Sequence, residues 1–505
     1  MLVDGAPARE VGRASRGARV AWRLLANRRP MRDQPAVSMD EPCPANNWLD
    51  GRGRKDGTVG EGSAGAGPTA SHKIPMETHA RGSRCPLLTG PAITTALCLA
   101  LLLLKPRRAL AQGRVEYRYE DYREDGNRMD VQTHTAWFEY ALHEKVTARG
   151  SFTRDALAGA TPTGGPGEPG GPGYEWVNMR DLRNAGFVEA SIRAGRTLTT
   201  PQVAYSEESD YQSTGLSLTE TIDFNQRNTS LVLGLARNSD SVKGRFQRTF
   251  RHKGTWDWLL GVNQVLGPRT YATFNVTLGY ADGYLSDPYK GVNVFFDLPG
   301  DVFDANPWYA VDPEKRPSSK FKQVAFASIN HLVPAVNGAV DASYRFHHDN
   351  WGVIANTVQV GWAQKLGQRI TVAPLFRYHH QTAADFFVAR VNSDPAFAGS
   401  RVAFDSTNNF VGQEGVDPGF DLALADPANY QIVSIPAYPD HYSADYRLSE
   451  LQSFTFGVSV ALQVHERATL VLGYRRYDMQ GLDPRISAAT YPDAHIYSVG
   501  LSATF

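Results

Sequence analysis

The amino-acid sequence predicts an all-β protein: a closed antiparallel transmembrane β-barrel of about sixteen strands with long extracellular loops. Three observations predict this fold. The final segment, 497–505, alternates strictly between apolar and small polar residues. Similar segments fill the chain from residue 112 onward, where no helical period of 3.6 residues is found. Finally, long and short connections alternate along the chain, as the loops and turns of a bacterial barrel do.

The last strand carries the clearest pattern. Tyr497, Val499, Leu501, Ala503 and Phe505 share one face, whereas serine, glycine and threonine occupy the other. In a membrane barrel the apolar face contacts lipid and the polar face lines the lumen, so these five residues are a candidate membrane-insertion signal. The alternative is an amphipathic edge strand of a soluble β-sandwich.

The composition narrows the function classes. The chain of 505 residues is 42% hydrophobic and 21% charged, with a formal net charge of zero, which does not favour nucleic-acid binding. A mean hydropathy of -0.36 excludes a helical membrane bundle but not a barrel, because half of each barrel strand is polar. Cys43, Cys85 and Cys98 are the only cysteines, so residues 112–505 hold no disulfide framework or thiolate metal site.

The first 111 residues are expected to lie outside the folded domain. Residues 1–75 are rich in Arg, Gly, Pro and Ala and are interpreted as a disordered or mis-annotated extension. Residues 76–111 are interpreted as a signal peptide, because a basic region precedes the apolar run 93–104 and an Ala-Leu-Ala site. Positive charge at 105–108 is unusual there, and an uncleaved anchor is the competing interpretation. The barrel domain is predicted over 112–505.

Sixteen segments within that domain have the alternation and length of a membrane strand, which needs about 9–11 residues. They are 113–124, 130–142, 145–156, 184–194, 197–208, 211–223, 228–238, 254–266, 269–281, 321–333, 336–348, 352–366, 368–381, 443–463, 466–477 and 494–505. An even number places both termini on the periplasmic side. Such a sheet in lipid must close on itself, and a barrel of this size is wide enough for an aqueous channel.

The connections support this count because their lengths follow parity. The short ones are 143–144, 195–196, 224–227, 267–268, 334–335, 367 and 464–465. The long ones are 157–183, 239–253, 282–320, 382–442 and 478–493. Glycine and proline repeat through 164–173, so we expect no regular element in the loop 158–183. The loops 282–320 and 382–442 either fold into the lumen and narrow it or decorate the surface.

Charged residues of both signs fall on the predicted polar faces. The candidate lumen-lining residues are Glu116, Arg118, Glu120, Glu139, Arg149, Asp155, Arg377 and Arg475. They either tune ion selectivity or only solvate the interior and pair with one another.

Metal ligands are considered at two places and not assigned. The pairs His347-His348 and His379-His380 each offer one inward imidazole, because adjacent strand residues point to opposite faces. Glu207, Glu208 and Asp210, together with Asp282, Asp287 and Asp301, offer oxygen ligands of the kind calcium prefers, but solvated loop charge is the favoured interpretation. We predict no metal, no cofactor and no catalytic residue, since no known catalytic motif is found.

Five strings in 112–505 carry a resemblance to a known family. They are Ala158-Gly-Ala-Thr-Pro-Thr163, Ser206-Glu-Glu-Ser-Asp-Tyr-Gln-Ser213, Asp282-Gly-Tyr-Leu-Ser-Asp-Pro-Tyr289, Tyr344-Arg-Phe-His-His-Asp-Asn-Trp351 and Tyr378-His-His-Gln-Thr-Ala-Ala-Asp-Phe-Phe387. In this order they resemble a bacterial family of uncharacterised outer-membrane proteins, a domain of unknown function. The resemblance implies a barrel in a Gram-negative envelope and no activity.

Most of these strings fall at predicted strand ends, where they form a candidate rim motif. Its residues are Glu207, Glu208, Asp210, Asp282, Asp287, Tyr289, Asp349, Trp351 and Asp385. We expect them to fasten loops to the barrel rim, and a ligand site is the alternative.

These observations predict a porin-like passive channel for small polar solutes or ions in the outer membrane of a Gram-negative bacterium. A non-conducting structural or assembly barrel is the alternative, and a hydrolase with its site at the rim is a third. The expected partners are outer-membrane lipid and, during biogenesis, the barrel-assembly machinery. No nucleic acid is expected, and the oligomeric state is not predicted.

Overall fold

The computed structural model describes residues 113–166, 174–244, 249–296, 308–393, 397–407 and 409–505. The predicted extension and signal peptide, 1–111, lie outside the described residues, as do Asp301 and most of the Gly/Pro-rich run. In the described part of the chain, no helix is both long and apolar enough to cross a membrane.

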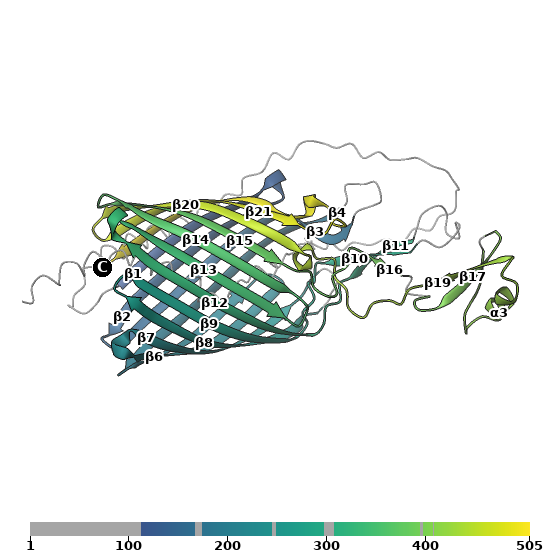
Figure 1. The fold of residues 1–505 in the computed structure, drawn as a ribbon, viewed down its shortest axis with the longest axis horizontal. Coiled ribbons are helices and arrows are strands. Elements are labelled where there is room, and N and C mark those ends of the chain that lie inside the picture. Colours follow the sequence, from purple (N-terminus) through teal and green to yellow (C-terminus); the bar gives the residue numbers. More distant parts are fainter. Residues whose placement is uncertain (1–112, 167–173, 245–248, 297–307, 394–396, 408) are drawn as a thin grey trace, which may run out of the picture. The chain divides into compact units, whose positions relative to one another are not determined.

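Sixteen antiparallel strands close into one barrel (Figure 1). In order they are β1 Gly113–Glu124, β2 Met129–His143, β3 Val146–Pro166, β4 Tyr174–Ala194, β5 Thr197–Glu207, β6 Tyr211–Phe224, β7 Thr229–Val242, β8 Arg251–Gly267, β9 Thr270–Gly283, β12 Ser319–Val333, β13 Gly338–Asp349, β14 Ile354–Leu366, β15 Ile370–Gln381, β20 Leu451–His465, β21 Ala468–Gly481 and β22 Asp493–Thr504. The barrel closes where β1 pairs with β22.

Alternation along the strands gives the barrel an apolar outside. Leu216 and Leu218 on β6 are half exposed, and Trp258 and Leu260 project from the same side of the wall. At the closing pair Tyr117 lies opposite Leu501, so apolar residues share a face across the seam. A closed ladder leaves no unpaired edge in lipid, which is the physical condition for a membrane barrel. The predicted fold class is confirmed.

Short turns lie at one end of the barrel, called here the turn end, and all the long connections lie at the other, called the loop end. The β4–β5 and β8–β9 connections at the turn end span 195–196 and 268–269. At the loop end, β9 and β12 are separated by 284–318 and β15 and β20 by 382–450. This arrangement confirms the predicted parity of the connections.

The β3–β4 connection differs from its prediction. Residues 158–166 and 174–183, expected to be irregular, extend β3 and β4 into a long hairpin in which Ala160 lies opposite Asn178. A register shift between Pro162 and Pro166 accommodates the prolines, so the strand continues where the composition predicted a loop. Residues 167–173 lie outside the described part.

The strand predicted over 443–463 also differs from its prediction. Residues 443–450 are not the start of β20 but form a separate segment with a 3-10 turn, Tyr446–Leu448. Asp445 caps this turn by accepting a hydrogen bond from the Arg447 amide, so the segment bends instead of extending.

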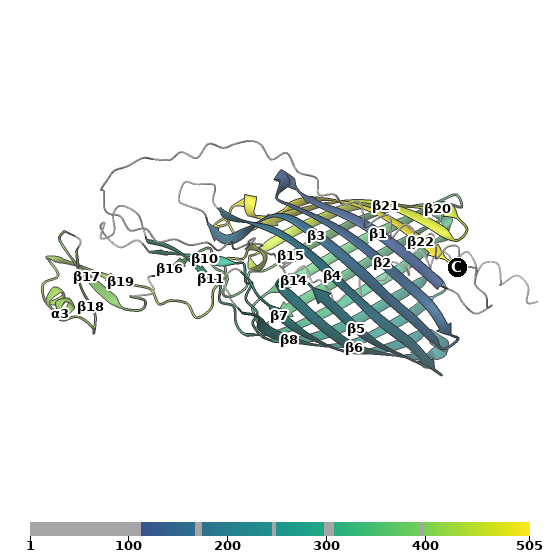
Figure 2. The same cartoon turned by 180° about the vertical axis from the view of Figure 1, so that it is seen from behind.

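Both long loops contain small sheets, which are labelled in Figure 2. Strands β10 Gly291–Phe296, β11 Trp308–Pro313 and β16 Val391–Asn392 form one of them, in which Val292 and Val294 are fully buried. Strands β17 Arg401–Asp405, β18 Phe410–Gln413 and β19 Tyr430–Ser434 form the other. Helix α3, Pro418–Ala425, packs Phe420 and Ala423 against the second sheet.

Candidate functional site: the inner wall and the loop end

All eight predicted lumen residues lie on the face of the wall opposite the exposed apolar residues. Glu116, Arg118 and Glu120 alternate with Tyr117 and Tyr119 along β1. Register transfers this face to neighbouring strands, because paired residues point the same way. Glu139 on β2, Arg149 and Asp155 on β3, Arg377 on β15 and Arg475 on β21 share this inner face.

Two guanidinium groups meet on one carboxylate near the β22–β1 seam. Oε2 of Glu120 accepts hydrogen bonds from Arg118 Nη2 and from Arg475 Nη2, each at 2.7 Å. The Arg118 side chain is 47% exposed and that of Glu120 26%. This cluster has two positive charges for one negative charge and remains in contact with solvent.

On strands β2, β3 and β4 the ratio is reversed, with two carboxylates around one guanidinium group. Arg149 Nε lies 2.6 Å from Glu139 Oε2, and its Nη1 lies 3.1 Å from Glu189 Oε1. The Ser191 hydroxyl accepts a further hydrogen bond from Arg149 at 2.8 Å. One guanidinium therefore serves two carboxylates.

The remaining predicted lumen residues take part in simpler contacts. Asp155 lies 3.4 Å from Arg183 Nε, and Glu116 pairs with Arg114. Arg377 lies opposite Gln359 and Thr455 in the ladder. Sequence analysis did not single out Lys322 and Asp257, which face each other at 3.5 Å across β8, β9 and β12.

The loop end contains a buried network of charged residues that the sequence analysis missed. Arg447 contacts Asp445 and Asp287, with Nη2 2.7 Å from Asp287 Oδ2. Arg316 Nη2 lies 2.8 Å from Asp445 Oδ2, and Arg316 Nε lies 2.6 Å from Glu314 Oε1. The two arginines and their carboxylates are at most 16% exposed, and they join the β9–β12 loop to the segment 443–450.

Burial and neighbouring charges together set the pKa values of this network. Burial alone would raise the pKa of Asp445, but Arg447, Lys290 and Arg316 hold it well below its usual range. Glu314 accepts hydrogen bonds from the Ser443 hydroxyl and the Asp287 amide, yet burial raises its pKa to about 7. The carboxylates therefore differ in how firmly they keep their charge.

Lys290 extends the network to the β3–β4 hairpin. Its ammonium donates a hydrogen bond to the Pro162 carbonyl and lies 5.4 Å from the centroid of the Tyr446 ring. Burial lowers the pKa of Lys290 to about 8. One side chain thus connects the hairpin, the β9–β12 loop and the segment 443–450.

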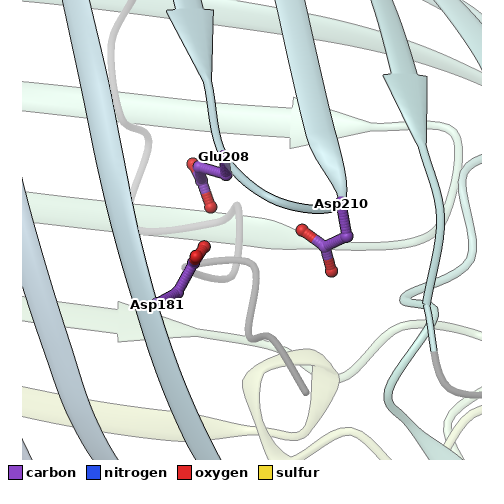
Figure 3. A group of neighbouring side chains, drawn as sticks. All are labelled: Asp181, Glu208 and Asp210. Carbon is purple, nitrogen blue, oxygen red and sulfur yellow. The ribbon is translucent and has the colours of Figure 1, made fainter. Parts of the chain in front are cut away.

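Three acidic residues meet beside this network (Figure 3). Oxygens of Asp181 on β4 and of Glu208 and Asp210 in the β5–β6 turn lie within 4.8 Å of one another. Burial raises the pKa of Glu208 to about 9, so its carboxyl is neutral at pH 7, and the Tyr289 hydroxyl donates to Asp210. The oxygens are of the kind that bind hard divalent cations.

The interpretation of Glu208 and Asp210 as solvated loop charges is wrong. Glu208 and Asp210 are buried, so solvated loop charge is the wrong description of them. Asp287 is held by Arg447, and Asp282 lies on β9 opposite Ser319. Their unexpected partner, Asp181, fell in a stretch predicted to be irregular.

Asp349, Trp351 and Asp385 lie together at the loop end. Asp349 accepts hydrogen bonds from the Trp351 and Val353 amides at 2.9 and 3.2 Å, and Lys320 Nζ lies 3.0 Å away. Trp351 packs edge-on against Phe386, and its carbonyl accepts a hydrogen bond from the Asp385 amide at 2.8 Å. These contacts hold the start of the β15–β20 loop against the end of β13.

The histidine pairs are divided between the two faces of the wall. His347 Nε2 lies 2.9 Å from Asp349 Oδ2 on the inner face, and His379 Nδ1 lies 2.9 Å from the Thr357 hydroxyl. His348 and His380 occupy the next strand positions, which point the other way. Within the described ranges, the acidic trio is the one group of three possible ligands.

The C-terminal residues complete the seam. Gly113 and Phe505 exchange two backbone hydrogen bonds of 3.0 Å. The Phe505 ring lies over Gly113, where an added Cβ would come within 2.3 Å of the ring. Tyr497, Val499 and Leu501 are exposed on the outside, whereas Ala503 is buried between neighbouring strands.

Comparison with known proteins gives one family and distant structural likenesses. The sequence profile of "Protein of unknown function (DUF3570)" matches residues 172–251 and 245–489. No curated protein matches the chain.

Among solved structures, CdiB from Acinetobacter baumannii is 8% identical to this chain, with a TM-score of 0.41. The match covers 78% of this chain and 60% of CdiB. OccK2 of Pseudomonas aeruginosa, solved with glucuronate, is 8% identical, with a TM-score of 0.37. The match covers 78% of this chain and 98% of OccK2. The ferric enterobactin receptor PfeA of Pseudomonas aeruginosa is 11% identical, with a TM-score of 0.35. The match covers 78% of this chain and 60% of PfeA. The chain thus spans less than two thirds of the length of CdiB and PfeA.

Proposed function

The chain belongs to the DUF3570 family of proteins of unknown function, and we propose that it is a porin-like passive channel for small polar solutes or ions. The observation that carries this proposal is the solvent exposure of charged side chains on the inner wall. Arg118, Glu120 and Arg475 lie inside a closed barrel yet remain partly exposed. Sixteen strands leave room for an aqueous interior, and such side chains hydrate it.

The loop end supports a channel that is narrowed there. Gln381, on the inner face of β15, donates hydrogen bonds to the Arg447 and Ser449 carbonyls at 2.8 and 3.1 Å. Tyr289 packs against Leu157 and Val177, which continue the inner face of β3 and β4. Segments of two long loops are therefore attached to inward-facing side chains, which favours passage of small solutes over large ones.

The same attachment favours the second candidate, a non-conducting barrel with its lumen closed by loops. The two functions differ in one respect that can be measured, which is whether ions cross the barrel. We propose no catalytic role.

We also propose where the barrel lies. The protein is in the outer membrane of a Gram-negative bacterium, in contact with outer-membrane lipid and inserted by the barrel-assembly machinery. Residues 76–111 are proposed as the signal peptide that directs export, residues 1–75 as an extension outside the domain, and 112–505 as the barrel domain.

Single-channel current in a planar bilayer tests this function. Protein purified from outer membranes, with folding checked by a heat-dependent gel shift, is expected to give discrete ohmic steps of stable size. A folded barrel that inserts without producing steps would overturn the channel and support the closed barrel.

A further inference from the structure

Four arginines lie on the inner face of four strands around one sector of the wall. We call them the basic stripe: Arg345 on β13, Arg377 on β15, Arg475 on β21 and Arg118 on β1. The strand order β13-β14-β15-β20-β21-β22-β1 places one strand between each of these strands and the next. The stripe therefore uses every other strand of this sector.

Directly beside the four arginines, the intervening strands present uncharged side chains on the same face, and two of these positions are glycines. In the ladder Arg345 lies opposite Thr357, Arg377 opposite Gln359 and Thr455, Arg475 opposite Gly457 and Arg118 opposite Gly500. An added Cβ at Gly457 would come within 2.8 Å of Arg475 Cγ, so the glycine makes room for this side chain. The guanidinium groups thus stand over a polar floor that is uncharged at these positions.

Three arginines of the stripe, Arg118, Arg475 and Arg345, carry more positive charge than the described carboxylates beside them neutralise. Glu120 is shared by Arg118 and Arg475 through a single oxygen. Within the described residues, no carboxylate forms an ion pair with Arg345. On β13 itself, Asp349 is bound by Lys320 and His347, and Asp341 lies nearer the β12–β13 turn.

We propose that the basic stripe is the solute track of the channel and that it takes small organic carboxylates. This inference rests on the proposed channel function and names its substrate class. A guanidinium group matches a carboxylate with two parallel hydrogen bonds, and hydroxyl groups of the floor add further donors. Partial exposure of the stripe keeps each site weak, and several weak sites in sequence permit conduction.

Reversal potentials test the stripe. Wild-type protein in a potassium chloride gradient is expected to be anion-selective, and potassium acetate in place of chloride is expected to keep that preference. The double variant Arg345→Gln/Arg377→Gln is expected to lower the anion-to-cation permeability ratio by more than about fivefold, because it removes two unit charges and a single one at ~4 Å in water is worth about fivefold. Arg149→Gln is the comparison for charge outside the stripe, because it removes one inward guanidinium that lies between two carboxylates, and its effect on the ratio is expected to be smaller than that of the double variant.

The possible results distinguish failure of the channel proposal from failure of the basic-stripe proposal. Absence of current from folded protein would overturn the channel itself. A conducting protein that prefers cations, or a double variant with unchanged selectivity, would overturn the stripe and leave the channel standing. Permeation of inorganic phosphate but not acetate would overturn the carboxylate assignment.

Discussion

The Arg118–Glu120–Arg475 cluster and the Arg316–Asp445–Arg447 cluster have the same chemistry in different surroundings. Each places two guanidinium groups on one carboxylate. On the inner wall the Arg118 side chain is 47% exposed, whereas at the loop end Asp445 is 1% exposed. An exposed ion pair contributes about 0–1 kcal/mol to stability, but breaking a buried pair costs about 3–5 kcal/mol. Burial therefore gives the second cluster a structural role, whereas the exposure of the first agrees with the proposed contact with solutes.

Loss of Arg447 is expected to have the largest effect. Arg447→Ala leaves the buried carboxylates of Asp445 and Asp287 without their main partner, which costs about 3–5 kcal/mol. Hydrogen–deuterium exchange in 286–290 and 443–449 is expected to accelerate, while the heat-dependent gel shift of the barrel persists. Unchanged exchange in these segments would contradict a structural role for the network.

Removal of the Tyr289 hydroxyl tests the attachment of the β9–β12 loop. Tyr289→Phe deprives buried Asp210 of a donor, and an unsatisfied buried acceptor costs about 1–3 kcal/mol. Limited proteolysis of 284–296 is expected to become faster. Tyr497→Phe, on the exposed outer face, is the control and is expected to leave proteolysis unchanged.

The attachment is also expected to depend on pH through Glu208. Its pKa is raised by burial to about 9, whereas an unfolded glutamate titrates near 4.3. The folded state therefore holds a proton that the unfolded state releases, so stability falls as pH rises from about 4.3 to about 9, by at most ~1.4 kcal/mol per unit. Protection of the β5–β6 turn from exchange, taken relative to the intrinsic rate at each pH, is expected to be higher at pH 6 than at pH 9, and Glu208→Gln should flatten this profile. A wild-type profile as flat as that of the variant would contradict a proton held by Glu208 in the folded state.

The smallest effect on stability is expected on the inner wall. Arg118→Ala removes a solvent-exposed ion pair and should change stability by about 0–1 kcal/mol, measured by urea unfolding. A loss comparable to that of Arg447→Ala would show that the two clusters do not differ in the way their burial indicates.

The strands could be predicted because the signal for each is local. Alternation such as that of Tyr497 and Val499 defines a face within a few residues, and all sixteen barrel strands follow from it. The loop-end network could not be predicted in this way. Asp287 and Arg447 are separated by 160 positions, and they were assigned to a predicted loop, 282–320, and a predicted strand, 443–463, so nothing in the sequence brought them together. Alternating charges in Glu314-Lys-Arg316 and Asp445-Tyr-Arg447 were the available signal, but loop charges are ordinarily solvated.

The contrast between a hydrated wall and a buried attachment is tested most directly by single-channel currents of the wild type and Arg447→Ala in the same bilayer. We expect discrete steps from the wild type and larger or noisier steps from the variant, because released loops no longer narrow the loop end. Folded wild-type protein without current, or identical steps from both proteins, would contradict this view of the barrel.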